Sequence, residues 1–220
     1  MDQQEQLIEA IKVGEIAKVK QLIDEDAELV NTRTTQGLSA VLLAAYYQEP
    51  EIATLLASHR TELDIFEASA VGDLAQVRQA IHRDVHSVNA FAEDGFQPLG
   101  LACFFGQGEV VTYLLGMGAE VNSPSKNNMR VMPLHSAVAR RNMEITRLLL
   151  AAGAEVNAIQ ADDFSPLHEA AQNGQLEMVK LLIEYGADPQ QTNKDGKNAL
   201  QIAGEHQHSD VVQYLTLLED

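Results

Sequence analysis

Residues 166–171 read Pro-Leu-His-Glu-Ala-Ala, and related segments occur three more times in this chain of 220 residues. The related segments are Pro98-Leu99-Gly100-Leu101-Ala102, Pro133-Leu134-His135-Ser136-Ala137 and Ala199-Leu200-Gln201-Ile202-Ala203. They begin at positions 98, 133, 166 and 199, so the pattern returns every 33 to 35 residues. A fixed period of this length is typical of repeat proteins, in which each copy is one small unit of helices and turns.

The copy at residues 163–193 indicates how one repeat folds. Ser165 can cap a helix that begins at Pro166, where the missing backbone N–H costs nothing. Gly174 can adopt the left-handed turn that ends this short inner helix, and a second helix with apolar residues at helical spacing follows. Residues 193–196, Asn-Lys-Asp-Gly, have the composition of a tight turn. Because such short helices are marginal alone, consecutive repeats must bury each other's faces.

The period and the repeated segments resemble the ankyrin repeat from end to end of the chain. The resemblance implies an all-α fold, an ankyrin-repeat solenoid of stacked helix-turn-helix units with β-hairpin fingers. It implies a single ankyrin-repeat domain over residues 1–220. Seven repeats are expected, at approximately 3–31, 37–62, 64–89, 95–122, 130–157, 163–189 and 196–220.

The spacing between the second and third repeats is anomalous. With Pro166 as the reference position, the repeats are anchored at Gln6, Ala40, Asp64, Pro98, Pro133, Pro166 and Ala199. The 24 residues from Ala40 to Asp64 have room for two helices but not for a finger, so we expect a gap in the finger row and Asp64 as a helix cap. The gap is either a notch that admits a partner loop or a second copy of the chain, or drift between duplicated halves. An offset of 58 residues aligns residues 7–63 with 65–121 and indicates that duplication.

Composition and charge limit the classes of function. With 45% hydrophobic and 21% charged residues the chain is expected to fold, and its formal charge of −17 repels phosphate backbones. Nucleic acid is therefore disfavoured as a partner, and a basic or apolar protein fits better. Many soluble proteins are acidic for solubility alone, and this alternative also explains the charge. Since there is no secretory signal and no apolar run of membrane-spanning length, we expect no membrane contact and a cytoplasmic location.

Candidate catalytic and metal-binding residues are few. Cys103, the single cysteine, stands at a position expected to be buried, and His82 and His86 straddle a helix end without a third ligand. The ankyrin resemblance implies that His135 and His168 tie neighbouring loops together by hydrogen bonds. His206 and His208 are expected to be solvated. We therefore expect no enzyme activity, no cofactor and no metal; a small hydrolase or metal-dependent enzyme would need bound metal or clustered ionisable groups.

Six of the eleven Phe and Tyr residues fall on positions that partners usually touch in proteins similar to this one. An apolar band across repeats two to four is expected from Tyr46, Tyr47, Ala70, Val71, Phe96, Phe104 and Phe105. The alternative is that these rings pack against their own fingers. The expected partner-binding residues are Leu38, Tyr46, Tyr47, Val71, Phe96, Phe104, Phe105, Met129, Arg140 and Asn173.

The hypothesis that follows is a non-enzymatic protein–protein interaction module. It binds a partner protein or peptide on its concave face and finger tips, and a monomer is expected rather than a homo-oligomer. The alternative is a self-associating structural or scaffold protein that uses the same aromatic patch. The longer finger at residues 123–130 carries Lys126 and Arg130, and it either steers an acidic segment or reflects loop drift.

Overall fold

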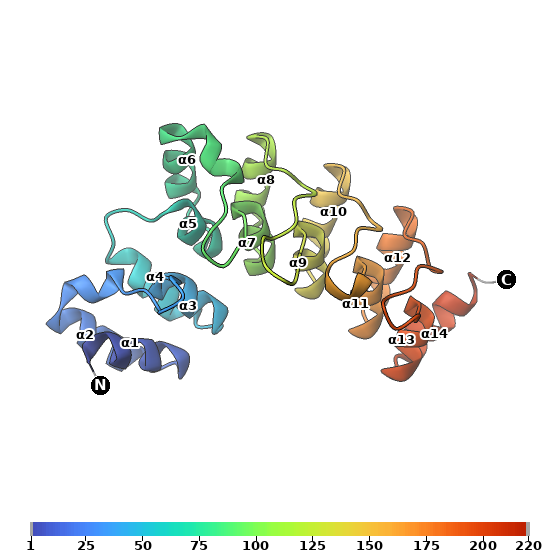
Figure 1. The fold of residues 1–220 in the computed structure, drawn as a ribbon, viewed down its shortest axis with the longest axis horizontal. Helices are drawn as coiled ribbons and strands as arrows, with labels where there is room; N and C mark the ends of the chain where they lie inside the picture. Colours follow the sequence, from blue (N-terminus) through green and yellow to red (C-terminus); the bar gives the residue numbers. More distant parts are fainter. Residues whose placement is uncertain (1, 219–220) are drawn as a thin grey trace. The chain divides into compact units, whose positions relative to one another are not determined.

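The structure is a computed structural model that describes residues 2–218. Within that range it contains fourteen α-helices, three short 3-10 helices and no β-strand (Figure 1). The α-helices are α1 Gln3–Lys12, α2 Ile16–Glu25, α3 Ala40–Tyr46, α4 Pro50–Ser58, α5 Ile65–Val71, α6 Leu74–Arg83, α7 Pro98–Phe105, α8 Gly108–Gly116, α9 Pro133–Ala139, α10 Met143–Ala151, α11 Pro166–Gln172, α12 Leu176–Glu184, α13 Ala199–Glu205 and α14 Ser209–Thr216. The 3-10 helices are η1 Ala27–Asn31, η2 Val85–Asn89 and η3 Ala161–Asp163.

The chain forms two compact units, residues 1–114 and residues 115–220. In the first unit the inner helices α1, α3, α5 and α7 pack on one another in chain order, and α2 packs on α4. In the second unit α9, α11 and α13 pack in the same way, and α12 packs on α14. The inner helices α1, α3, α5, α9, α11 and α13 pair with the outer helices that follow them, for example α3 with α4 and α11 with α12. The predicted all-α fold of stacked helix pairs is therefore confirmed.

Inner helix α11 begins and ends at the residues that the sequence predicts. The Ser165 side chain accepts a hydrogen bond from the His168 backbone N–H, and Pro166 occupies the first helical turn. Ala170 and Ala171 are fully buried, and their small side chains let the neighbouring inner helices approach closely. Gly174 follows the helix with φ +62°, in the left-handed region.

Three other repeats make the same turn without glycine. Gln48, Arg141 and Gln207 take φ values of 60°, 58° and 62° at the corresponding position. An L-residue in this conformation costs roughly 1–2 kcal/mol, because its Cβ approaches a backbone carbonyl. These turns are therefore less stable than the glycine turn at residue 174.

Buried histidines connect inner helices to the fingers. The His168 Nε2 atom lies 2.9 Å from the Gln191 carbonyl, and the His135 Nε2 atom lies 3.1 Å from the Phe164 carbonyl. Both contacts are the loop-tying hydrogen bonds that the sequence resemblance implies. Burial lowers the pKa of His135 to about 4, because the charged imidazolium would lose its contact with water.

The fingers differ from the prediction of β-hairpins. The one β-bridge within residues 2–218 joins Arg33 and Ser39, and the fingers are otherwise tight turns such as Asn193–Lys197, whose N···O distance is 3.0 Å. Each finger pairs too few residues on its two sides to form strands. Adjacent fingers in the second unit are joined by one backbone hydrogen bond each, from Ala161 N–H to Met129 and from Lys194 N–H to Asp162, both at 2.9 Å.

The predicted duplication in the first unit is visible in its elements. Helix α6 and the 3-10 helix η2 have the bounds of α2 and η1 shifted by 58 residues. Asp26 caps η1 by accepting from the Glu28 N–H, and Asp84 caps η2 by accepting from the His86 N–H. The loop after the outer helix therefore forms the same short helix in both halves.

The finger expected to be missing is absent from the structure. Helix α4 ends at Ser58 and α5 begins at Ile65, with Asp64 as its cap. In Figure 1 the helix pair α3–α4 is turned relative to the pair α5–α6. An open cavity of about 770 Å³ lies at this turn, lined by residues of η1, of the linker 59–63 and of the end of α6.

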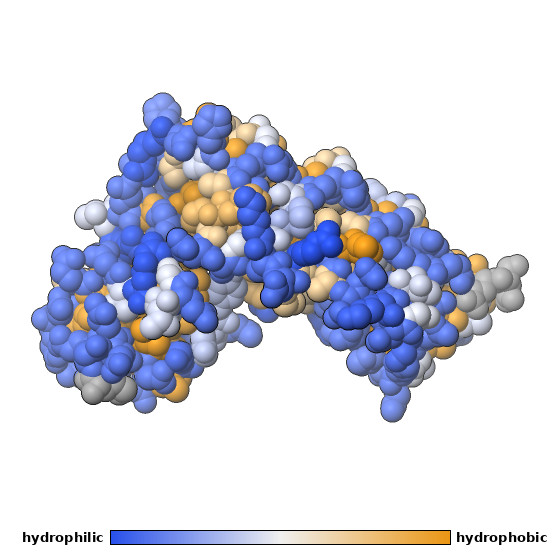
Figure 2. All heavy atoms as spheres, viewed as in Figure 1, coloured by the Kyte–Doolittle hydropathy of each residue, from blue (hydrophilic) through white to orange (hydrophobic). Residues whose placement is uncertain are grey.

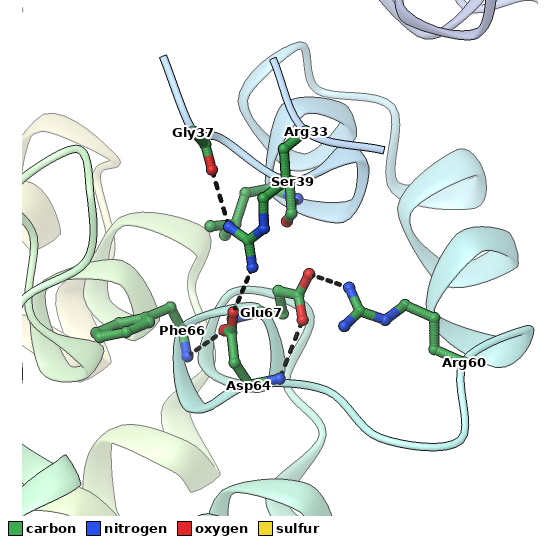
Figure 3. A network of polar contacts seen from close by, with 8 residues as sticks. Arg33, Gly37, Ser39, Arg60, Asp64, Phe66 and Glu67 are labelled. Carbon is green, nitrogen blue, oxygen red and sulfur yellow. Dashed lines mark hydrogen bonds and ion pairs between the residues drawn. The ribbon is translucent and has the colours of Figure 1, made fainter. Parts of the chain in front are cut away.

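A polar network holds the linker and α5 in place of the finger (Figure 3). Asp64 and Glu67 form a capping box, in which each side chain accepts from the other residue's backbone N–H. The Glu67 side chain is fully buried and pairs with Arg60, whose side chain is 16% exposed. Arg33, from the preceding finger, donates to the Gly37 carbonyl at 2.8 Å and to Asp64 at 3.4 Å. Charged groups thus connect segments that a finger would otherwise separate.

We expect Arg60→Ala to lower the free energy of unfolding by about 3 kcal/mol, because it leaves the buried Glu67 carboxylate without its cation. Urea unfolding followed by circular dichroism measures this loss. The double variant Arg60→Ala with Glu67→Gln should recover part of it, since a neutral amide can still accept from Asp64 N–H. An Arg60→Ala protein as stable as the wild type would contradict the role of this pair.

We also expect His135 to make stability depend on pH. Its folded pKa lies below the unfolded value of about 6.5, so between pH 6.5 and 4 the unfolded chain binds a proton that the native chain does not. The contribution of neutral His135 to the free energy of unfolding is therefore complete above pH 6.5. It falls by about 3 kcal/mol as the pH approaches 4. Urea unfolding at pH 7 and pH 4.5 should show a smaller pH effect in His135→Gln. The exposed control His86→Gln should keep the wild-type dependence.

Candidate protein-binding surface

The ends of inner helices α3 and α7 carry a cluster of aromatic rings in the first unit. The Phe104 and Phe105 rings lie edge to face at 90° with centroids 5.1 Å apart. The Tyr46 ring contacts both, at centroid distances of 6.1 Å to Phe104 and 5.3 Å to Phe105. Together with Tyr47 these residues are called the aromatic patch. Tilted and edge-to-face contacts of this kind stabilise aromatic clusters beyond the area that they bury.

A small buried cluster of Leu42, Ala70 and Leu101 lies beneath the aromatic patch. The half-buried side chains that pack against it include Leu38, Tyr46, Phe66, Phe96 and Phe105. Ala70 is only 2% exposed, so its predicted place in an exposed apolar band is wrong. Its methyl group serves the packing between α3, α5 and α7. The aromatic rings are therefore neither sealed inside the protein nor fully open to solvent.

Tyr46 is fixed by a hydrogen bond from its hydroxyl to the Asp94 carboxylate at 2.8 Å. Asp94 belongs to the finger at residues 91–97, 48 positions along the chain. Burial raises the pKa of Tyr46 above its ordinary value, and the negative charge of Asp94 raises it further. Tyr46 therefore stays protonated and connects the second repeat to the finger of a later one.

Tyr47 is the most exposed ring of the patch, at 47%. Val13 holds the corresponding turn of the first repeat and is 65% exposed. The two turns are neighbours, because a Cβ added to Gly14 would lie 2.7 Å from a Glu49 carboxylate oxygen. The exposed apolar surface thus extends into the first repeat. The sequence prediction missed Val13, although it follows the inner helix as Tyr47 does.

The other predicted partner-binding residues are divided between the two units. In the first unit Leu38, Val71 and Phe96 are half-buried, and Leu38 and Phe96 pack on the buried cluster. In the second unit Met129 is 57% exposed at a finger tip and Arg140 is exposed. Asn173 is half-buried, and its amide donates to Glu169 at 2.7 Å. The structure therefore brings Leu38, Tyr46, Phe96 and Phe105 together on the buried cluster, with Phe104 against the Tyr46 and Phe105 rings.

The burial and contacts of the cysteine and histidine side chains bear on the expected absence of a catalytic or metal site. Cys103 is fully buried, and burial raises the pKa of its thiol. His82 and His86 are exposed, whereas His208 is half-buried and bonds the Gln172 carbonyl at 2.9 Å, contrary to its expected solvation. Across residues 2–218 no three His, Cys, Asp or Glu side chains are grouped so as to hold a metal ion. No helix in that range is long and apolar enough to cross a membrane.

Most of the surface in Figure 2 is hydrophilic, and hydrophobic atoms gather in separate patches, one of them over the region of α5 and α7. Stacked helix pairs with projecting turns and such a surface define a helical-repeat protein. A family model described as "Ankyrin repeats (3 copies)" matches residues 65–160 and 134–219. The chain belongs to the ankyrin-repeat family. Members of this family are non-enzymatic protein–protein interaction modules.

Curated relatives carry the same repeats in much longer chains. "Ankyrin repeat and SAM domain-containing protein 6" is 33% identical over 148 residues in Mus musculus and 34% identical over 151 residues in Rattus norvegicus. These matches cover 67% and 69% of this chain but 14% of each relative. "BCL-6 corepressor-like protein 1" of Homo sapiens is 34% identical over 107 residues, which is 48% of this chain and 6% of that protein. This chain therefore corresponds to a small part of its relatives.

We expect Tyr46→Phe to lower the free energy of unfolding by about 1 kcal/mol, because it removes the hydrogen bond to Asp94 and leaves the ring in place. Urea unfolding measures the difference. Tyr47→Phe is the matched control, since the Tyr47 hydroxyl makes no hydrogen bond within residues 2–218 and its loss should change nothing. Equal stability of both variants would show that the Asp94 contact does not hold the patch.

Proposed function

We propose that this chain is a non-enzymatic module that binds a partner protein or peptide on its concave face and finger tips. The observation that carries the proposal is the aromatic patch, whose rings contact one another at the ends of α3 and α7 while Tyr47 stays exposed. Stacking of the helix pairs does not require rings at these positions, because other repeats hold Arg140 or Asn173 there. Exposed aromatic groups of this kind are typical centres of protein interfaces.

The patch is suited to binding because its rings are already ordered. Tyr46 is held by Asp94, and Phe105 packs on the buried cluster below it. A surface whose side chains are fixed before binding loses little conformational entropy when a partner docks. The rings also combine large apolar area with few rotatable bonds, which favours their use as anchors.

The charge of the chain supports a basic or apolar partner rather than nucleic acid. The formal charge is −17, and Glu93 is exposed on the finger that holds the patch. Such a surface repels phosphate and attracts lysine and arginine side chains. In the second unit Met129, Arg140 and Asn173 are proposed as further contact positions.

The test is the double variant Tyr47→Ala with Phe104→Ala, which should bind its partner at least tenfold more weakly because two anchor rings are lost. Partners captured from a native lysate by the wild type and by the variant are compared by quantitative mass spectrometry, and circular dichroism checks helical content. Tyr185→Ala is the control, since Tyr185 is 43% exposed at the end of α12 and is not part of the aromatic patch. Undiminished capture by the folded double variant would refute the proposed surface.

Light scattering over a range of protein concentrations separates this function from self-association through the same patch. We expect a monomer at all concentrations. If the chain forms a dimer, and the double variant Tyr47→Ala with Phe104→Ala dissociates it, the scaffold function would be favoured instead.

A further inference from the structure

A cleft of about 270 Å³ lies between the fingers at residues 33–39 and 91–97, where the row of fingers lacks one member. Its apolar lining comes from Leu38, Leu42, Phe66 and Phe91, and it is called the finger cleft. Leu42 belongs to the buried cluster beneath the aromatic patch, and Leu38 and Phe66 pack against that cluster. The finger cleft is therefore an apolar recess that continues from the proposed binding surface.

The rim of the finger cleft carries an uncompensated negative charge. Arg33 and Asp64 on the rim are paired with each other, as Figure 3 shows. The Glu93 carboxylate is exposed and makes no ion pair or hydrogen bond with any residue from 2 to 218. Its stem covers Gly37, where an added Cβ would lie 3.1 Å from Glu93 Cγ. Glu93 is thus held at the mouth of an apolar recess without a cation.

Backbone groups on the two fingers are also left without partners. In the second unit two fingers each donate one backbone N–H to the finger before them, Ala161 to Met129 and Lys194 to Asp162. The corresponding groups across the gap are the Glu93 N–H and the Gln36 carbonyl. Neither forms a hydrogen bond within the described part of the chain. The absent finger therefore leaves one donor and one acceptor available to another backbone.

We propose that the finger cleft binds an extended segment of the partner protein, with one apolar side chain in the recess and an adjacent lysine or arginine beside Glu93. The inference rests on the proposed function and names the chemistry of its partner. The recess takes the apolar group, Glu93 pairs with the cation, and the unpaired backbone groups bond the segment as a neighbouring finger would. The gap in the finger row is then a specificity pocket.

A second copy of the chain is a poorer occupant. Both copies would carry a formal charge of −17, so their approach is opposed by like charge. A basic segment is instead attracted to the acidic surface, and this attraction speeds its encounter with Glu93.

The experiment pans a displayed library of random ten-residue peptides against the wild-type chain. We expect enriched peptides to share an apolar residue next to lysine or arginine. The affinity of one enriched, fluorescein-labelled peptide is then measured by fluorescence anisotropy. Replacing its basic residue by alanine should weaken binding about fivefold, and added salt should reduce that difference.

Two variants of the chain test the finger cleft directly. Glu93→Gln keeps the shape of the side chain and removes its charge, so it should lower the affinity for the peptide about fivefold. Ala92→Leu places a larger side chain in the lining and should weaken it at least tenfold. The matched controls are Asp24→Asn, an exposed carboxylate on α2, and Ala161→Leu, on a finger with a bonded neighbour; both should bind as the wild type does.

The outcomes separate this inference from the proposed function. One outcome is that the peptides bind Glu93→Gln and Ala92→Leu as tightly as the wild type but bind the double variant Tyr47→Ala with Phe104→Ala more weakly. This outcome would overturn the proposal for the finger cleft and support the proposal for the aromatic patch. Enriched peptides without a basic residue, or no enrichment at all, would also overturn the cleft. The proposal would also be overturned if the chain forms a dimer and Ala92→Leu dissociates that dimer.

Discussion

The whole structure depends on burial of each inner helix between its neighbours. Helices of seven to ten residues are too short to be stable in water alone, and α3, α5 and α7 become helical because their apolar faces are shared. Small residues such as Ala170 and Ala171 permit the close approach, while capping side chains such as Ser165 set where each helix begins. Stability in such an array is therefore a property of adjacent repeats and of the turns that join them.

The missing finger shows what happens when one of those turns is replaced. A shorter connection brings Arg60 and Asp64 to the start of α5, where the buried Glu67 carboxylate needs a cation. In two other repeats a histidine, His135 or His168, joins the inner helix to the following finger by a neutral hydrogen bond. The ion-pair network therefore has the same role as the histidine, which is to connect an inner helix to a neighbouring loop, but it uses charged groups. A consequence is a cavity on the outer side and a cleft on the finger side of the same junction.

The proposed binding surface arises from the same junction. Tyr46 reaches the finger of a later repeat because no finger stands between them, and its bond to Asp94 orders the rings at the ends of α3 and α7. Apolar side chains then continue from the patch into the finger cleft. The fold and the proposed binding surface are therefore linked at one place in the first unit, where the regular repeat is interrupted.

The sequence by itself determined the family, the all-α class, the order of helices, the capping residues Asp64 and Ser165 and the histidine contacts. These features follow from local rules and from a period that several copies express independently. Only the tertiary structure decided that Ala70 is buried, that Val13 is exposed, that the fingers are turns without strands, and that Glu93 lies over Gly37. The physical reason is that burial and pairing depend on how closely segments tens of residues apart approach one another. That distance is set by the packing of whole helix pairs and not by any single repeat.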